Sequence, residues 1–159
     1  AMMPFWWAHS RFINDNVVNN QLTSLRRFTD KIPFAHLTGI KPADIKSSKG
    51  GDAYAMKSNE VVFGWIVNSD SDVANDKVTV SGIKNGKYKL RIFHTWRGIF
   101  LEEEDVTVTE GTISFGPPYM RIRGSQANYI GQDMAFILEY IPEPVVLPVK
   151  AREVKRSRN

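Results

Sequence analysis

The residues that could do chemistry in this 159-residue chain are carboxylates, three histidines and a set of aromatic side chains. The sequence contains no cysteine. Without cysteine, the chain forms no disulfide, thiolate metal site or thiol nucleophile. His9, His36 and His94 are spaced too far apart for a zinc motif. Ser10, beside His9, lacks the flanking glycines of a nucleophile elbow. These patterns predict no catalytic residue, no metal site and no cofactor.

Two oxygen-rich segments are the places where a hard cation such as calcium could bind. One is the run Glu102-Glu103-Glu104-Asp105, and the other spans residues 68–76 and carries Asp70, Asp72 and Asp76. The second segment lacks the glycine and the distal glutamate of a calcium loop. Asn, Asp and Ser also bond to their own backbone in ordinary turns. We expect a solvated bend at the first segment and a turn at the second, with calcium as the alternative at each.

The aromatic side chains offer a third chemistry, which is stacking against a flat ligand such as a sugar ring. Trp96 stands at the end of a predicted strand, and Tyr119 and Tyr129 lie in a loop-rich stretch. Trp65 and Tyr54 belong to the same set, but Trp65 lies in a segment that is apolar on both faces. We therefore expect Trp65 to be buried, so that Trp65→Ala would cost roughly 3–5 kcal/mol.

The elements that must position these residues begin with a strand and a helix in residues 1–33. Met2–Ala8 is wholly apolar, as expected of a strand covered on both faces. Asn14 or Asp15 can cap the following helix, and Pro33 ends it. One apolar stripe recurs at three- and four-residue spacing along that helix and consists of Val18, Leu22, Leu25, Phe28 and Ile32. Residues 34–52, rich in glycine, serine and lysine, predict a connector.

Residues 53–142 predict an antiparallel β-sandwich, because short alternating segments recur about every ten residues. Glu60–Asn68 and Met134–Ile141 are apolar on both faces, which is typical of central strands. The pairs Asn85-Gly86 and Glu110-Gly111 each predict a hairpin turn. His94 falls on the apolar face of its segment and is expected to be a hydrogen-bonded core histidine.

The net positive charge of the chain lies in its last ten residues. Residues 143–159 form a proline-rich and then basic tail. Within it, residues 150–159 carry five Lys or Arg and one Glu, so that the net charge of +4 leaves residues 1–149 at zero. A nucleic-acid partner is therefore not predicted. No apolar run reaches the roughly 18 residues that span a bilayer, so we expect no membrane association.

The order of these elements resembles the C-terminal part of a cellulase-like (β/α)8 glycoside hydrolase. Met3-Pro4-Phe5-Trp6-Trp7, followed by Gln21-Leu22-x-x-Leu25-x-x-Phe28, is similar to the last barrel strand and helix, and Val62-Phe63-Gly64-Trp65-Ile66 resembles the sandwich that follows the barrel. Members usually carry an acidic residue where Ala8-His9 stands here. The resemblance implies sugar stacking by Trp6 or Trp7 and a periplasmic or extracellular location. The catalytic carboxylates of that family lie on earlier barrel strands.

The predicted fold is therefore mainly β, an antiparallel β-sandwich preceded by one strand–helix unit that resembles the end of a (β/α)8 barrel. We expect an accessory, structural region of a glycoside-hydrolase-like protein that is not catalytic by itself. Its partner would be the missing catalytic barrel, or a second copy joined through the N-terminal strand. A free-standing sandwich that binds a polysaccharide or a protein is the alternative. The candidate sugar-stacking residues are Trp6, Trp7, Trp96 and Tyr119.

Overall fold

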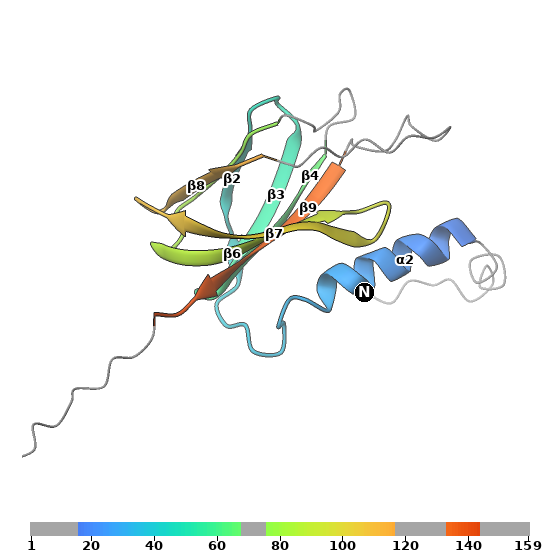
Figure 1. Cartoon of the computed structure of the whole chain (residues 1–159), viewed down its shortest axis with the longest axis horizontal. Helices are drawn as coiled ribbons and strands as arrows, with labels where there is room; N and C mark the ends of the chain where they lie inside the picture. Colours follow the sequence, from blue (N-terminus) through green and yellow to red (C-terminus); the bar gives the residue numbers. More distant parts are fainter. Residues whose placement is uncertain (1–15, 68–75, 117–132, 144–159) are drawn as a thin grey trace, which may run out of the picture.

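The computed structural model describes residues 16–67, 76–116 and 133–143 (Figure 1). The described residues form a helix followed by antiparallel strands, which confirms the predicted mainly β fold. The elements in chain order are α2 (Asn16–Thr29), β1 (Lys41–Pro42), β2 (Asp44–Ser47), β3 (Asp52–Lys57), β4 (Val61–Val67), β5 (Val78–Ser81), β6 (Gly86–His94), β7 (Ile99–Val108), β8 (Thr112–Phe115) and β9 (Asp133–Ile141). The predicted strand Met2–Ala8 lies outside the described residues.

The strands form two sheets. The larger has the order β1-β3-β4-β9-β6-β7, and the smaller has the order β2-β5-β8. Helix α2 runs along one side of the larger sheet, and the smaller sheet lies on the other side (Figure 1). The described part of the chain therefore has three layers: a helix, a large sheet and a small sheet. No helix within it is long and apolar enough to cross a bilayer.

The main hydrophobic core lies between the two sheets. Its two halves meet at Phe115 of β8 and Phe136 of β9, whose ring centroids are 5.0 Å apart. The core's fully buried side chains include Val62, Ile66, Leu90, Ile92, Met134 and Leu138 from the large sheet and Val78 and Val80 from the small one. We call the face of the large sheet that points into this core its inner face.

The opposite, outer face of the large sheet carries a second, smaller core beneath α2 and the turn that follows the helix. Ile32, Val61 and Ile137 are buried there, with Phe28 and Phe63 packed against them. Val61 and Val62 are neighbours on β4 and are each 1% exposed, one on each face. The prediction that this segment and Met134–Ile141 are central strands with two apolar faces is confirmed.

The predicted hairpin at Asn85-Gly86 is wrong. Strand β5 pairs with β2 and β8, whereas β6 pairs with β7 and β9, so residues 82–85 carry the chain from one sheet to the other. The side chain of Asn85 is used differently, because its Oδ1 accepts a hydrogen bond of 2.6 Å from the N–H of Gly111. Asn85 thus ties the crossover to the turn between β7 and β8.

The chain does reverse at the second predicted turn, Glu110-Gly111, but the strands on its two sides belong to different sheets. Glu110 and Gly111 have φ of 53° and 68°, and a type I′ turn requires positive φ at both central residues. The N–H of Thr112 donates to the carbonyl of Thr109 at 3.0 Å. Beyond this bridge, β7 continues in the large sheet and β8 in the small one. A turn signal therefore identified the reversal without identifying the strand partners.

The segment predicted as a connector, residues 34–52, contains two short strands. All four residues of β2 pair with β5, and Asp76 anchors the turn that follows β2. The Asp76 side chain is 2% exposed and accepts hydrogen bonds from Ser47 Oγ at 2.5 Å and from the Ser48 N–H at 2.9 Å. Burial alone would raise the pKa of Asp76, but these hydrogen bonds outweigh it and lower the pKa. Asp76 therefore has a structural role, whereas residues 68–75 lie outside the described residues.

The acidic run Glu102–Asp105 is part of strand β7 and not a bend between strands. Glu103 accepts a hydrogen bond from Arg91 Nε at 2.8 Å, and Asp105 accepts one from Lys89 Nζ at 3.0 Å, both across the β6–β7 pair. Arg91 also pairs with Glu139 of β9 at 2.6 Å. Cross-strand cations therefore offset the charge of Glu103 and Asp105 within the sheet.

Candidate functional site

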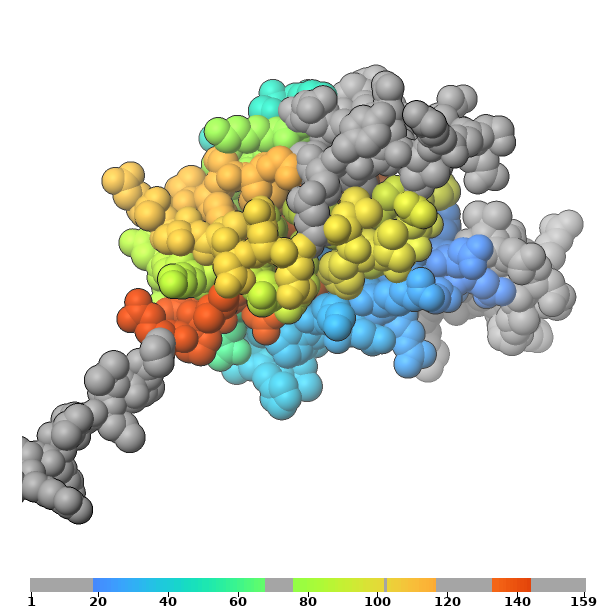
Figure 2. Space-filling view, viewed as in Figure 1, coloured from blue at the N-terminus to red at the C-terminus, as the bar shows by residue number. Residues whose placement is uncertain are grey.

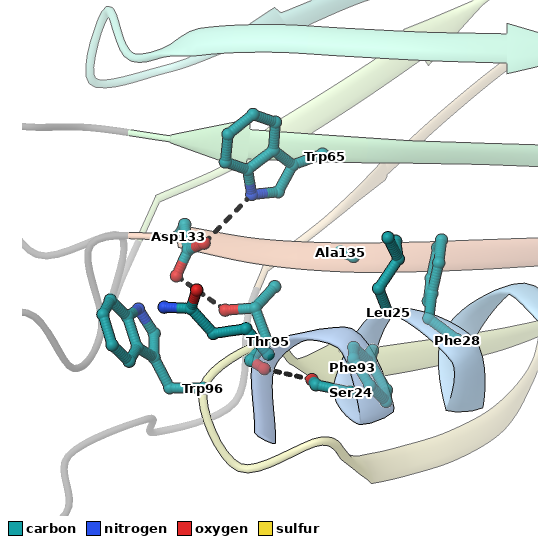
Figure 3. A pocket seen from close by; sticks show the side chains of 10 residues that line it. Ser24, Leu25, Phe28, Trp65, Phe93, Thr95, Trp96, Asp133 and Ala135 are labelled. Atoms are coloured by element: carbon teal, nitrogen blue, oxygen red, sulfur yellow. Dashed lines mark hydrogen bonds between the residues drawn. The ribbon is translucent and has the colours of Figure 1, made fainter. Parts of the chain in front are cut away.

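A pocket of about 420 Å³ opens between α2 and the outer face of the large sheet (Figure 3). Four elements supply its walls: α2, β4, the end of β6 with the residues that follow it, and the start of β9. The lining residues are Gln21, Ser24, Leu25, Phe28, Trp65, Phe93, Thr95, Trp96, Asp133 and Ala135.

The pocket exists because a small residue stands between two large ones. On the outer face, Ala135 of β9 lies opposite Trp65 of β4 on one side and opposite Phe93 of β6 on the other. Directly opposed residues of antiparallel strands share a face. Alternation along β6 places Phe93 on this face, whereas its neighbour Ile92 points into the core. The alanine therefore forms a floor between two aromatic walls.

Helix α2 borders the pocket without filling it, because it approaches the sheet through Ser24. This side chain is 5% exposed, and its Oγ donates a hydrogen bond to the carbonyl of Thr95. Gly98 permits the approach, since a Cβ there would lie 3.2 Å from Ser24 atoms. Arg27 Nη1 donates to the carbonyl of Gly98 at 3.2 Å. Figure 2 shows the helix, in blue, seated against the connection between β6 and β7, in yellow.

This contact means that the predicted apolar stripe of the helix faces the sheet only in part. Phe28 packs on Phe93 with ring centroids 5.3 Å apart, and Ile32 is buried. Leu22 and Leu25, however, are 59% and 58% exposed. The three- and four-residue spacing located the helix, but the helix ends at Thr29 and not at Pro33, so Ile32 belongs to the turn that follows. A hydrogen-bonding serine, Ser24, and not a leucine, joins the helix to the residues after β6.

Asp133 is the carboxylate of the pocket and joins two of its walls. Its Oδ2 accepts a hydrogen bond from Trp65 Nε1 at 3.2 Å, and its Oδ1 accepts one from Thr95 Oγ1 at 2.7 Å (Figure 3). An ionised carboxylate offers about four acceptor positions. Asp133 is partly exposed, so each oxygen keeps capacity for a further donor.

Trp65 is not buried, and this prediction is wrong. It lies on the expected face of β4, but 43% of its side chain is exposed. The helix and the turn after it pack against Val61 and Phe63 on the same face, whereas Trp65 lines the pocket that remains between the helix and the sheet. A sequence pattern shows which residues share a face, whereas the reach of the covering helix decides which of them are buried.

His94, just beneath the pocket wall, is the buried core histidine that the sequence predicted. It is 1% exposed, and its Nδ1 accepts a hydrogen bond of 3.4 Å from the N–H of Arg97. Its Nε2 has no hydrogen-bond partner among the described residues. Burial and the positive charge of Arg97 lower the pKa of His94, and the negative charge of Asp133 opposes them. Burial and Arg97 therefore both favour the neutral imidazole.

Of the residues predicted to stack on sugars, the structure places Trp96 in the pocket, where 46% of its side chain is exposed. Trp6, Trp7 and Tyr119 lie outside the described residues, as does Tyr129. Sequence reasoning missed Asp133 and Ala135. Asp133 opens an apolar segment and could have been noted, but only the strand register places it beside Trp65.

Possible metal ligands do not gather in the described ranges, where no three His, Asp or Glu side chains come close enough together to hold an ion.

Comparison with known proteins adds a likeness of fold. No family model and no curated protein matches the sequence. A solved structure named "Glycoside hydrolase" is similar, with a TM-score of 0.50 and 19% sequence identity. The match covers 88% of this chain and 28% of that one. The fold is thus related to part of a glycoside hydrolase, and this chain spans little more than a quarter of that structure's length.

Proposed function

We propose that this chain is the C-terminal accessory region of a glycoside-hydrolase-related protein and is not catalytic by itself. This proposal rests on the way α2 is attached: one side of the helix contacts the sandwich, and Leu22 and Leu25 remain exposed. Leu22 and Leu25 keep more than half of their side chains in solvent. An exposed apolar strip on a surface helix marks an interaction site. The remaining part of a larger protein would pack there.

The attachment of the helix supports a role for the sandwich as a brace. Ser24 and Arg27 hydrogen-bond to the backbone of the β6–β7 connection, and Phe28 packs on Phe93. These contacts fix the direction of α2 relative to the sheet. A barrel that ended in this helix would therefore be held in a fixed orientation by the sandwich.

The carboxylates also favour a non-catalytic role. Retaining glycosidases place two carboxyl groups about 5–5.5 Å apart across the bond they cleave. Among the described residues that line the pocket, Asp133 is the one carboxylate, and it is hydrogen-bonded to Trp65 and Thr95. Such a site lacks a second acid–base partner.

The proposal is tested with an antibody raised against the chain and applied to its natural source. We expect it to capture a polypeptide much longer than 159 residues. The captured protein should hydrolyse glycosides, and the purified chain should release no reducing sugar from the same panel. A native product of the chain's own length, or hydrolysis by the purified chain, would overturn the proposal.

A further inference from the structure

An exposed row of aromatic side chains leads along the outer face into the pocket. Tyr54 of β3 lies opposite Trp65 of β4, so the two share this face. Tyr54 is 60% exposed and Trp65 is 43% exposed. Trp96 stands on the far side of the pocket with 46% of its side chain exposed. Three large aromatic side chains thus surround or approach one hollow.

Polar groups converge on the same hollow. Asp133 lies between the two tryptophans and holds both Trp65 and Thr95 by hydrogen bonds (Figure 3). Gln21 of α2 adds an amide to the opposite wall. Small-molecule sites are mainly apolar cavities of about 300–1,000 Å³ with a few convergent polar groups. The pocket, at about 420 Å³, fits that description.

The charges around the pocket favour an uncharged ligand. Asp133 is the one formally charged side chain among the described lining residues, and it would repel an anion. Arg97 directly follows Trp96 in the chain, and its positive charge, like the negative charge of Asp133, acts on His94 beside the pocket wall, so charges of both signs lie near the pocket.

We propose that the pocket and the Tyr54–Trp65 row bind a neutral oligosaccharide, independently of whether the proposed accessory role holds. A neutral pyranose has an apolar face of C–H groups and a rim of hydroxyl groups. Its face would lie on the indole of Trp65 or Trp96, and its hydroxyls would donate to Asp133 and bond to the amide of Gln21. Further sugar units would extend over Tyr54 toward the edge of the sheet.

The assay is binding of the purified full chain to an array of neutral hexasaccharides, with β-1,4-linked glucose, xylose and mannose and β-1,3-linked glucose as members. Oligogalacturonate and tetramethylammonium serve as the anionic and cationic probes. We expect one or more neutral members to bind and both charged probes to fail. Absence of any neutral hit, or equal binding of either charged probe, would overturn the proposal.

Variants then locate the bound sugar by titration calorimetry. Trp65→Ala and Trp96→Ala should each weaken binding roughly tenfold through lost stacking. Asp133→Asn should weaken it by a similar factor, because hydrogen bonds to a charged carboxylate are the stronger ones. Ala135→Leu should abolish binding by filling the floor while leaving every polar group in place. Circular dichroism confirms that each variant is folded.

Leu22→Ala is the matched control. Leu22 is apolar and 59% exposed, as accessible as the aromatic residues, and it does not line the pocket. We expect unchanged affinity for the neutral hexasaccharide. Equal loss in Leu22→Ala and Trp65→Ala would overturn the assignment of the site. Leu25, the other leucine assigned to the larger protein, lines the pocket, so Leu22 is the member of that strip suited as a control. The titration uses the purified chain alone and the antibody capture uses the natural source, so the two proposals can fail separately.

Discussion

The two faces of the large sheet differ in how completely they are covered. The inner face meets the small sheet along its length, and its residues on β9, Met134, Phe136 and Leu138, are each 0% exposed. The outer face is covered by α2 over Val61 and Ile137 and is open at Trp65. The outer face also carries charged residues on β6, β7 and β9, among them Arg91, Glu103 and Glu139. The difference indicates that the inner face serves stability, whereas the open part of the outer face is available to a ligand.

The largest expected effect comes from the inner face. Phe136→Ala removes a fully buried ring that packs 5.0 Å from Phe115, and we expect a loss of about 3–5 kcal/mol in the free energy of unfolding. Urea denaturation of the purified variant measures this loss. A loss below about 1 kcal/mol would show that the core between the sheets is not the main source of stability.

A substitution at the contact between α2 and the β6–β7 connection should have a smaller effect on stability. Gly98→Ala places a methyl group about 3.2 Å from Ser24, at a φ of 62° that costs an L-residue about 1–3 kcal/mol. We expect faster amide hydrogen exchange in α2, with the exchange of β4 and β9 nearly unchanged. Unchanged exchange in α2 would contradict the close Ser24–Gly98 contact as the anchor of the helix.

The buried histidine gives a pH dependence of known sign. Because the pKa of His94 is lowered in the folded protein, the unfolded chain binds the proton first as the pH falls. Stability should be complete above the ordinary pKa of 6.5 and should be lost as the pH falls from there toward the folded value, by at most about 1.4 kcal/mol per pH unit. Urea midpoints at about pH 7.5 and about pH 5.5 test this.

His94→Gln is the comparison variant for that measurement. It removes the titrating group, so stability should change less across the same pH window than in the unmodified chain. An identical slope in both proteins would assign the pH dependence to other groups.

The smallest effect is expected at the open end of the outer face. Trp65→Ala should lower the free energy of unfolding by about 1 kcal/mol or less, because 43% of the side chain already lies in solvent. Urea denaturation beside Phe136→Ala makes the two faces directly comparable. Equal losses in the two variants would mean that the outer face is covered as fully as the inner one.

Local sequence patterns predicted the fold class and the two-faced strands, because period-two alternation depends on neighbouring residues alone. They failed where strand pairing or burial depends on residues that are distant in the sequence. The Asn85-Gly86 signal could not show that β5 and β6 belong to different sheets, and the apolar run around Trp65 could not show that a pocket remains between α2 and that side chain. The pocket itself requires Trp65, Ala135 and Phe93 to be in register across three strands, which only the pairing reveals.

The most direct test of an open, ligand-binding outer face is nuclear magnetic resonance of the tryptophan indole N–H groups during titration with a neutral hexasaccharide that binds in the array. Trp→Phe variants assign the signals. We expect the signals of Trp65 and Trp96 to shift together and saturate at a common affinity. Saturable binding that leaves both signals in place would contradict this assignment of the outer face.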